Sequence, residues 1–372
     1  MNPSKAWRAI VFVVLLAMLF AACAKPPAAE TPAGEVAPTE EVTPAGEVAP
    51  TEEVTPAIEL PTELRVAAIL SQSIDSSWDY TFVESFRRVQ QLAPHGLRID
   101  DIVWTEGVWD AEAEVVLREY AESGLYDIIW CHTTCSDQVG NLMNDYPEIL
   151  WVYVASGNEG LGGNAYWDYK RIHEPAYLMG MLAGYMTQTD TIGVVGTYAF
   201  DDVNDVINAY IQGAREVNPA VRARVTFIES WYDPARALEA SNAQIAAGVD
   251  HLLQLAEGFD ACTGNVFCYG PYGDYNFIAP NNVLTSAVSY WDPDILWIID
   301  EWWHHRTTGE PYDGNTEPRW FTMAEGAADL APFHGLESRI PPEAYDAVMQ
   351  ARQDILDGRL EVELNIEPPV SD

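Results

Sequence analysis

The stretch that most constrains the fold of this chain is Glu174–Gly196, EPAYLMGMLAGYMTQTDTIGVVG. Between Tyr177 and Met186 nearly every residue is apolar, so a helix here has no polar face and must be buried between other layers. Pro175 stands where a first-turn proline is tolerated, because that N–H has no intrahelical partner. Ile192–Gly196 is short, apolar and ends in glycine, which is typical of a parallel strand with close backbone contact at its carboxyl end. We interpret this stretch as the junction between two lobes.

Apolar strands alternate with amphipathic helices on both sides of this junction. The alternation predicts an α/β protein of two doubly wound lobes, each with a parallel sheet, and a ligand cleft between the carboxyl ends of the sheets. We expect lobe 1 to span 61–172 with part of 271–310, and lobe 2 to span 173–270 with part of 311–366. The expected strands are Leu64–Leu70, Leu97–Trp104, Tyr126–Cys131, Glu148–Ala155, Ile192–Gly196, Ala223–Ser230, Val249–Ala256, Val266–Gly270 and Val283–Trp291. The expected helices are Thr81–Gln91, Asp110–Gly124, Asp137–Tyr146, the junction helix, Asp202–Val217, Pro234–Ala247 and Pro342–Gly358.

Residues 1–22 have the pattern of a signal peptide. Lys5 and Arg8 precede the apolar run Ala9–Phe20, which is too short to span a membrane. The sequence Ala-Ala-Cys that follows resembles a bacterial lipobox and implies that Cys23 is lipidated. Ordinary cleavage without a lipid is the alternative.

The segment 23–60 predicts a tether. It is made largely of Pro, Ala, Thr, Glu, Val and Gly, and TPAGEVAPTEEV occurs at Thr31–Val42 and again at Thr43–Val54. With no aromatic residue and no helical periodicity, we expect it to be disordered and to hold the folded part away from its anchor.

The net negative charge of the chain excludes some kinds of binding partner. The whole chain carries −38, and removal of residues 1–22 leaves 17 basic against 57 acidic residues, a net charge of −40. Nucleic acid and anionic lipid surfaces repel such a protein.

Four cysteines follow Cys23. They form two close pairs, Cys131 with Cys135 and Cys262 with Cys268. An even number in an exported chain favours disulfides, and neither spacing matches a zinc-binding C-x-x-C. We expect a local bridge within each pair, with buried free thiols as the alternative, and no metal or cofactor.

Five motifs in a fixed order resemble the basic membrane protein family of lipoproteins. The resemblance covers Leu64 to Leu364 and implies a type I periplasmic-binding-protein fold and the role of the substrate-binding component of an ABC importer, as in the purine nucleoside receptors of that family. The motifs are IDSSWDYTFVESF, EPAYLMGMLAGYMTQTDTIGVVG, INAYIQGAREVNP, ESWYDPARALEASNAQIAAGVD, and APNNVLTSAVSYWDP followed by EGAADLAPFHG.

The same resemblance implies a ligand site. Trp78 and Trp231 match the aromatic residues that clamp a flat heterocycle, and such rings supply apolar area and a quadrupole contact. Asp75 and Asp79 lie beside the first ring. The other implied contacts are Asp137 as a base-reading carboxylate, Asn164 at the cleft, Gly258 at a glycine turn near the ligand, and Asp274 on sugar hydroxyls.

Three departures from the family pattern fall in the implied pocket. Asp79 replaces an asparagine, Ala287–Ser289 stand where many members have a lysine after Leu-Thr-Ser, and the Cys131–Cys135 loop is uncommon. The ligand therefore stays open between purine nucleosides, other flat heterocycles such as nucleobases or a flavin, and a non-aromatic solute such as a sugar.

The enzyme hypothesis lacks a catalytic constellation. Glu301, His304 and His305 are close in sequence, but adjacent histidines point to different sides of an element, and there is no G-x-S-x-G or P-loop. We expect a monomeric, lipid-anchored, extracytoplasmic binding protein whose partners are a small-molecule ligand and an ABC permease. A ligand-sensing receptor domain of the same fold is the alternative.

Overall fold

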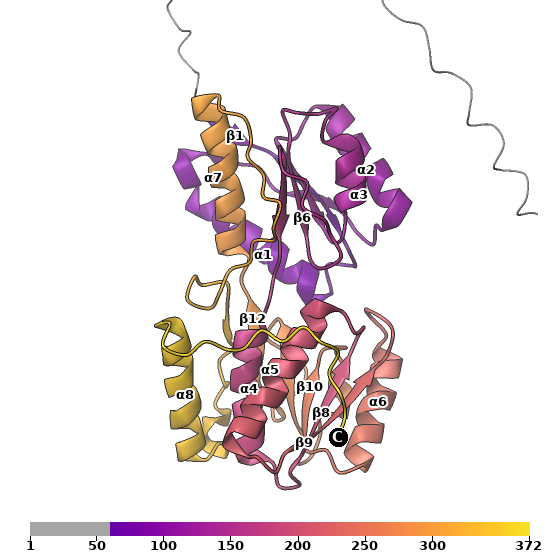
Figure 1. The fold of residues 1–372 in the computed structure, drawn as a ribbon, viewed down its shortest axis with the longest axis vertical. Helices are drawn as coiled ribbons and strands as arrows, with labels where there is room; N and C mark the ends of the chain where they lie inside the picture. The colour runs from indigo at the N-terminus through magenta and orange to yellow at the C-terminus, as the bar shows by residue number, and fades with distance from the viewer. Residues whose placement is uncertain (1–59) are drawn as a thin grey trace, which may run out of the picture. The chain divides into compact units, whose positions relative to one another are not determined.

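The computed structural model describes residues 60–372 (Figure 1). The predicted signal peptide, the lipidated Cys23 and nearly all of the tether lie outside the described residues. The elements in chain order are β1 (Glu63–Leu64), β2 (Val66–Leu70), α1 (Ser77–Leu92), η1 (Pro94–Gly96), β3 (Arg98–Ile99), β4 (Val103–Thr105), α2 (Asp110–Ser123), β5 (Ile128–His132), α3 (Ser136–Leu142), β6 (Leu150–Val154), β7 (Ala165–Asp168), α4 (His173–Met186), β8 (Thr191–Gly196), α5 (Asp201–Val217), β9 (Arg222–Phe227), α6 (Pro234–Ala246), β10 (His251–Gln254), η2 (Phe259–Ala261), β11 (Phe267–Tyr272), β12 (Val283–Ser289), α7 (Asp292–Thr308), β13 (Ala328–Leu330), η3 (Leu336–Arg339) and α8 (Pro342–Leu356).

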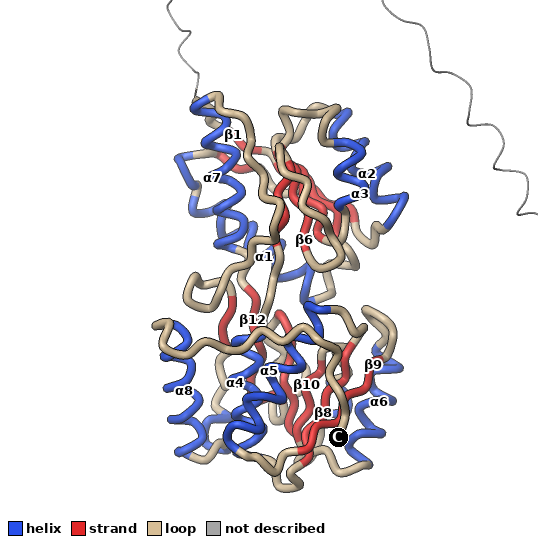
Figure 2. The backbone as a smooth tube through the Cα atoms, in the orientation of Figure 1, coloured by secondary structure: helices blue, strands red, loops and turns tan. Residues whose placement is uncertain are grey.

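Two sheets form two lobes, which Figure 2 shows in red between layers of blue helices. The first sheet has the order β4-β2-β5-β6-β7 and is parallel throughout. Every residue of β2, β5 and β6 is buried, as expected for parallel strands covered on both faces. Side chains of α1 and α7 pack on one face, and those of α2 and α3 pack on the other.

The second sheet has the order β13-β12-β11-β10-β8-β9. All neighbours are parallel except the short β13, which pairs antiparallel with β12 at the edge. Helices α4, α5 and α8 share one apolar cluster on this sheet, and α6 packs on the opposite face. The predicted α/β fold with two doubly wound lobes is confirmed.

The junction helix α4 is buried over most of its length, as its composition predicts. It lies directly against α5 at glycine positions of both helices. A Cβ added to Gly180 would lie 2.0 Å from the carbonyl oxygen of Tyr210, and one added to Gly213 would lie 2.0 Å from that of Tyr177. Only glycine permits this backbone approach, so the two helices form a single layer beneath the second sheet.

Some predicted elements differ in extent. The strand expected over Leu97–Trp104 is two short strands, because the chain first pairs with β1 and then, after a break, with β2. The hydrophobic pattern of the sequence also did not predict strands β7 and β13 or helix α7. Helix α7 carries Trp297, Trp302 and Trp303 on different faces, so it has no clear amphipathic period.

The chain crosses between the lobes three times. It leaves the first sheet after β7, returns to the first lobe after β12 to form α7, and then runs along β7 before it enters the second sheet at β13. Isolated bridges from Gly163 to Gly314 and from Asp168 to Arg319 fix that last segment against the first lobe. Figure 1 shows α7, in orange, beside the indigo α1.

A buried ion pair joins two of these crossings. Lys170 Nζ donates to Asp294 Oδ2 at 2.6 Å and to the carbonyl oxygen of Tyr290 at 3.0 Å, and it lies 4.8 Å from the ring centre of Trp291. Burial and the adjacent Asp294 carboxylate raise the pKa of Asp168 well above its usual range. Two of the crossings between the lobes are therefore joined by a fully buried ion pair.

The C-terminal tail covers the outer edge of the second sheet. The amide and carboxylate of Asp372 both bond the backbone of Ala223 in β9, and the Ser371 hydroxyl accepts from the amide of Val225. Earlier in the tail, the side chains of Asn204 and Asn208 on α5 donate to backbone carbonyls of residues 365–367. The tail is thus joined both to the edge strand and to α5.

The predicted local pairing of cysteines is confirmed. Cys131 is bonded to Cys135 at the end of β5, and Cys262, which follows η2, is bonded to Cys268 in β11. Within residues 60–372 no cluster of His, Cys, Asp or Glu has the arrangement of a metal site. None of the helices in this part of the chain is both long and apolar enough to cross a membrane.

Candidate functional site

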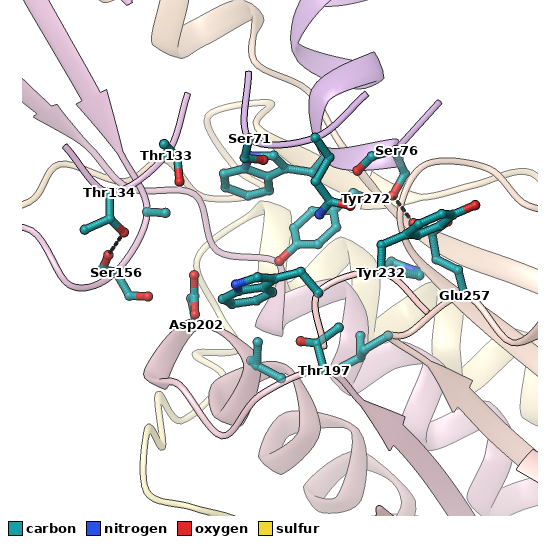
Figure 3. A pocket seen from close by; sticks show the side chains of 18 of the residues that line it. Ser71, Ser76, Thr133, Thr134, Ser156, Thr197, Asp202, Tyr232, Glu257 and Tyr272 are labelled. Carbon is teal, nitrogen blue, oxygen red and sulfur yellow. Dashed lines mark hydrogen bonds between the residues drawn. The ribbon is translucent and has the colours of Figure 1, made fainter. Parts of the chain in front are cut away.

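A cavity of about 850 Å³, counting the open solvent at its mouth, lies where the carboxyl ends of both sheets meet. Its place at the carboxyl ends of the strands is where ligands bind in open α/β sheets. The two lobes contribute equally to its lining (Figure 3). Lobe 1 supplies hydroxyl groups from Ser71, Ser76, Ser77, Thr133, Thr134 and Ser156, together with Trp78. Lobe 2 supplies Asp202, Trp231, Tyr232, Glu257 and Tyr272.

Trp78, the first aromatic residue that the resemblance singled out, lies on the first turn of α1 and lines the cavity. Its indole N–H donates to the carbonyl oxygen of His132 at 3.3 Å. Its ring meets Tyr272 of the second lobe and Trp291 edge-on, each at 5.1 Å between centres. These contacts fix the ring before any ligand arrives, and the contact with Tyr272 crosses from one lobe to the other.

Trp231 lies in the loop between β9 and α6 and also lines the cavity. It stacks on Phe200 at 5.7 Å with an interplanar angle of 21°, and it meets Tyr198 at 5.0 Å. Its side chain is 37% exposed, so part of the ring is uncovered. The two tryptophans that the resemblance singled out are therefore brought to one cavity from opposite lobes.

Asp79 does not line the cavity but holds the loop that does. It is fully buried, and its carboxylate accepts from the amides of Ser71 at 3.2 Å and Gln72 at 3.0 Å. Burial raises its pKa to about 7, although these hydrogen bonds oppose the shift. Asp75, in the same loop, is exposed and is not among the lining residues.

The loop between β5 and α3 presents Thr133 and Thr134 to the cavity. The Cys131–Cys135 disulfide closes this loop, and the Asn158 side-chain oxygen accepts from the amides of Cys135 and Ser136. Thr134 donates to the carbonyl oxygen of Ser156 at 2.6 Å. Asp137, one turn further on, is exposed and does not line the cavity.

Asn164 lies at the opposite end of the first sheet. It precedes β7, so it is at the amino end of the strands, whereas the cavity is at their carboxyl ends. Its amide nitrogen donates to the carbonyl oxygens of Met143, Tyr146 and Ile149. These three hydrogen bonds give Asn164 a structural role at a position away from the cavity.

Gly258 and Asp274 are near the cavity without lining it. A Cβ on Gly258 would lie 2.9 Å from the backbone of Ala237, so the glycine permits close packing on α6. The Asp274 carboxylate is bonded to the ring of His334 at 2.6 Å, and about a third of its side chain is exposed.

Two lining carboxylates were not predicted. Asp202 is on the first turn of α5, and burial raises its pKa to about 6, with Asp201 adding to the shift. Glu257 follows β10, and its Oε1 accepts from the Ser77 hydroxyl of lobe 1 at 3.1 Å. Burial also raises the pKa of Glu257. The signal that could have found both is their place in the connections that follow buried strands of the second sheet: Asp202 opens the helix after β8, and Glu257 is in the loop after β10.

Two lobes of this topology, joined by crossings and enclosing a cavity at the carboxyl ends of their sheets, define a type I solute-binding protein. The family model described as "ABC transporter substrate-binding protein PnrA-like" matches residues 65–310. The chain belongs to this family, whose members are substrate-binding proteins of ABC transporters rather than enzymes. The family implies a small-molecule ligand and a permease partner.

Proteins named for different ligands are similar to this chain. A "purine-binding protein" of Brucella abortus is 24% identical over 70% of this chain and 72% of its own length. A "putative ABC transporter glucose-binding protein" of Haloferax volcanii is 30% identical over 56% of each chain. An ABC transporter solute-binding protein from Conexibacter woesei has a TM-score of 0.65 at 17% identity, with 82% of this chain and 100% of that one covered, which shows the fold.

Proposed function

We propose that this protein captures a purine nucleoside or a similar flat heterocycle between its lobes and delivers it to an ABC permease. The observation that carries the proposal is the pair of tryptophans, Trp78 and Trp231, that line one cavity from opposite lobes. A planar ring between them would gain stacking area on both faces. The purine-binding relative supports the same ligand class.

The mechanism we infer is domain closure. The lobes pivot about the crossings near Lys170, and the bond from Ser77 to Glu257 joins the lobes at the cavity. A ligand that contacts both lobes favours the closed state over the open one, because only the closed state makes both sets of contacts. The closed form would then present both lobes together to the permease.

The location of the protein is part of this proposal. The apolar leader and Cys23 support export followed by attachment of the mature chain to the cell membrane through a lipid. A monomer suffices, because one chain contains both halves of the cavity.

A sugar is the second candidate ligand. It is favoured by the glucose-binding relative and by the many hydroxyl groups of lobe 1. The same capture could also serve a sensing receptor, which would bind the ligand equally but would not support its uptake.

The test is a thermal-shift screen of the protein against nucleosides, nucleobases, flavins, sugars and amino acids, followed by calorimetry. A ligand that binds only the native state at about a hundred times its Kd stabilises it by about 2.7 kcal/mol. A shift with nucleosides or nucleobases supports the proposal. A shift with sugars alone contradicts the heterocycle and keeps the transporter role.

A further inference from the structure

Strand β11 ends in a tight turn beside lobe 1. The amide of Gly273 donates to the carbonyl oxygen of Pro271 at 2.6 Å, which closes a three-residue turn around Tyr272. Tyr272 has a φ of +56°, in the left-handed region that residues other than glycine rarely adopt. Strained residues of this kind persist where the surrounding structure holds them, and they gather at functional sites. The turn therefore points to a function for this part of lobe 2.

The loop after the neighbouring strand β10 contains a second strained residue. Glu257 has a φ of +62°, and its Oε1 accepts from the Ser77 hydroxyl at 3.1 Å. The ring of Tyr272 meets Trp78 edge-on at 5.1 Å between centres. Ser77 and Trp78 both belong to the first turn of α1, in lobe 1. Two strained residues of lobe 2 thus contact one turn of lobe 1.

Gly273 lies against the same turn of α1. A Cβ added to Gly273 would lie 3.3 Å from the Cβ of Ser77 and 4.0 Å from Cγ2 of Thr81. Its backbone is not in the left-handed region, so the conformation of the turn does not require glycine at this position. What the missing side chain permits is the close approach of lobe 2 to α1.

We propose that Gly273 is a positioning residue for ligand capture: because it has no side chain, lobe 2 can close onto the first turn of α1. This inference rests on the proposed capture by domain closure and names the residue that limits the closure. Gly273 does not line the cavity, so it acts through the spacing of the lobes. A ligand that needs the closed form binds more weakly in proportion as that form is less populated.

The test adds a side chain between the lobes. Valine has two methyl groups on Cβ and few allowed rotamers, so Gly273→Val should hold α1 and lobe 2 farther apart. Gly273→Ala adds the Cβ alone. It should separate the lobes less, because a spacing of 3.3 Å is only slightly below the optimum of about 3.5–4.0 Å between carbon atoms.

The spacing of the lobes is measured by pulsed electron paramagnetic resonance without ligand. Nitroxide labels are attached at Glu112→Cys on α2 and Glu239→Cys on α6, two exposed positions on opposite lobes. The background contains Cys23→Ser, and the remaining native cysteines are bonded in pairs, so the labels react at the new thiols. We expect the mean distance to increase from the wild type to Gly273→Ala and again to Gly273→Val.

Two controls separate lobe spacing from a general loss of stability. Gly140→Val adds the same bulk inside lobe 1, where a Cβ would contact the Leu161 side chain at 3.6 Å, so the distance between the labels should be unchanged. Ser77→Gly removes the Cβ that Gly273→Ala would meet. In a Ser77→Gly background, Gly273→Ala should therefore no longer increase the distance. The melting temperature of each variant reports its fold.

Calorimetry with adenosine measures the consequence for capture. Gly273→Val should bind adenosine at least about tenfold more weakly than the wild type, whereas Gly140→Val should be unchanged. If Gly273→Val does not fold, Gly273→Ala should show a smaller change in the same direction. Unchanged distances in folded Gly273 variants, or longer distances with unchanged adenosine affinity, overturn the inference.

Failure of the proposed function has a different result. If the wild type binds D-glucose and not adenosine, the affinity for D-glucose is compared in the same variants and decides in the same way. If it binds neither, the capture function falls, but the distances need no ligand. Longer distances in the Gly273 variants then support its role in limiting the approach of the lobes, and equal distances overturn that role.

Discussion

The two halves of the cavity differ in charge although they are built alike. Each is formed by loops at the carboxyl ends of a mostly parallel sheet. The half from lobe 1 is uncharged and rich in hydroxyl groups, whereas the half from lobe 2 contains both carboxylates. Lobe 1 also has a buried carboxylate nearby, Asp79, but its oxygens are bonded to the loop backbone.

This difference teaches that a carboxylate on the first turn of a helix beside the cavity has two distinct uses. In lobe 1, Asp79 fixes the shape of a loop and leaves neutral groups facing the ligand. In lobe 2, Asp202 and Glu257 are themselves lining residues of the cavity. Lobe 1 thus determines the shape of its half of the cavity, and lobe 2 determines which ligand charges the cavity favours. Four predictions test this difference between the lobes.

The largest effect is expected from removing the aromatic ring of each half. Stacking of a base on an aromatic side chain is worth about 1–3 kcal/mol, so Trp78→Ala with Trp231→Ala should lower nucleoside affinity at least about 100-fold. Calorimetry with adenosine gives the affinity, and circular dichroism checks the fold. The double Phe variant, which keeps both rings, should retain most of the affinity. If the double alanine variant folds and keeps wild-type affinity, the ligand does not stack between the two tryptophans.

The second-largest effect on affinity is expected from protonation of Asp202, in the half of the cavity that lobe 2 forms. Because burial raises the pKa of Asp202 to about 6, its carboxylate gains a proton as the pH falls through that value. A ligand that donates to the ionised form should therefore bind about tenfold more weakly at pH 5 than at pH 7. The groups around Asp202 are Asp201 and Asp205 on α5, Arg171 on the crossing and Tyr272 on β11.

Asp202→Asn supplies the control for this pH effect. Affinity measured by calorimetry between pH 5 and pH 7.5 should change much less in this variant than in the wild type. An equally steep profile in both proteins would assign the titration to another group, such as Asp205, whose pKa burial raises to about 7.

A smaller effect is expected from the loop support in lobe 1. Asp79→Ala leaves the buried amides of Ser71 and Gln72 without their acceptor, which should lower the free energy of unfolding by about 1–3 kcal/mol. Affinity should fall several-fold as well, because the same loop presents Ser71 to the cavity. Urea unfolding with an unchanged m-value measures the first effect. Asp79→Asn keeps a side-chain oxygen and should lose less stability; equal losses in both variants would contradict the role of that oxygen.

The smallest effect on binding is expected at the far end of lobe 1. Asn164→Ala leaves three backbone carbonyls without their donor, so stability should fall by about 1–3 kcal/mol while nucleoside affinity stays within about twofold. Asn164→Asp keeps the shape but turns a buried carboxylate toward these carbonyl oxygens, so it should lose more stability than the alanine variant in urea unfolding. If Asn164→Ala folds but binds the nucleoside much more weakly than the wild type, Asn164 belongs to the binding site.

The sequence predicted most of the fold because its helices and strands have clear periodicity and turn signals. The exceptions have physical causes. Helix α7 is apolar or aromatic on several faces, and β7 is short and lies between glycine-rich and polar segments. Missing β7 had a consequence for the site, because Asn164 immediately precedes this strand and so lies at the end of the sheet away from the cavity.

The candidate site could be predicted only in part. The resemblance singled out Trp78 and Trp231, and both line the cavity, because each lies in the connection that follows the carboxyl end of a parallel strand. It did not identify Asp202 or Glu257, since their role depends on the placing of α5 beside the cavity and on a contact between lobes, neither of which a linear motif contains. The distinction between Asp79 and Asp202 is likewise visible only in their hydrogen-bond partners.

The C-terminal tail has a consequence for how this protein behaves at high density. Strand β9 is the open edge of the second sheet, and an uncovered edge strand can pair with the same strand of another molecule and begin aggregation. Ser371 and Asp372 occupy the outward-facing backbone groups of Ala223 and Val225 and so block that pairing. Another molecule that approaches this edge therefore finds the backbone groups of Ala223 and Val225 already bonded.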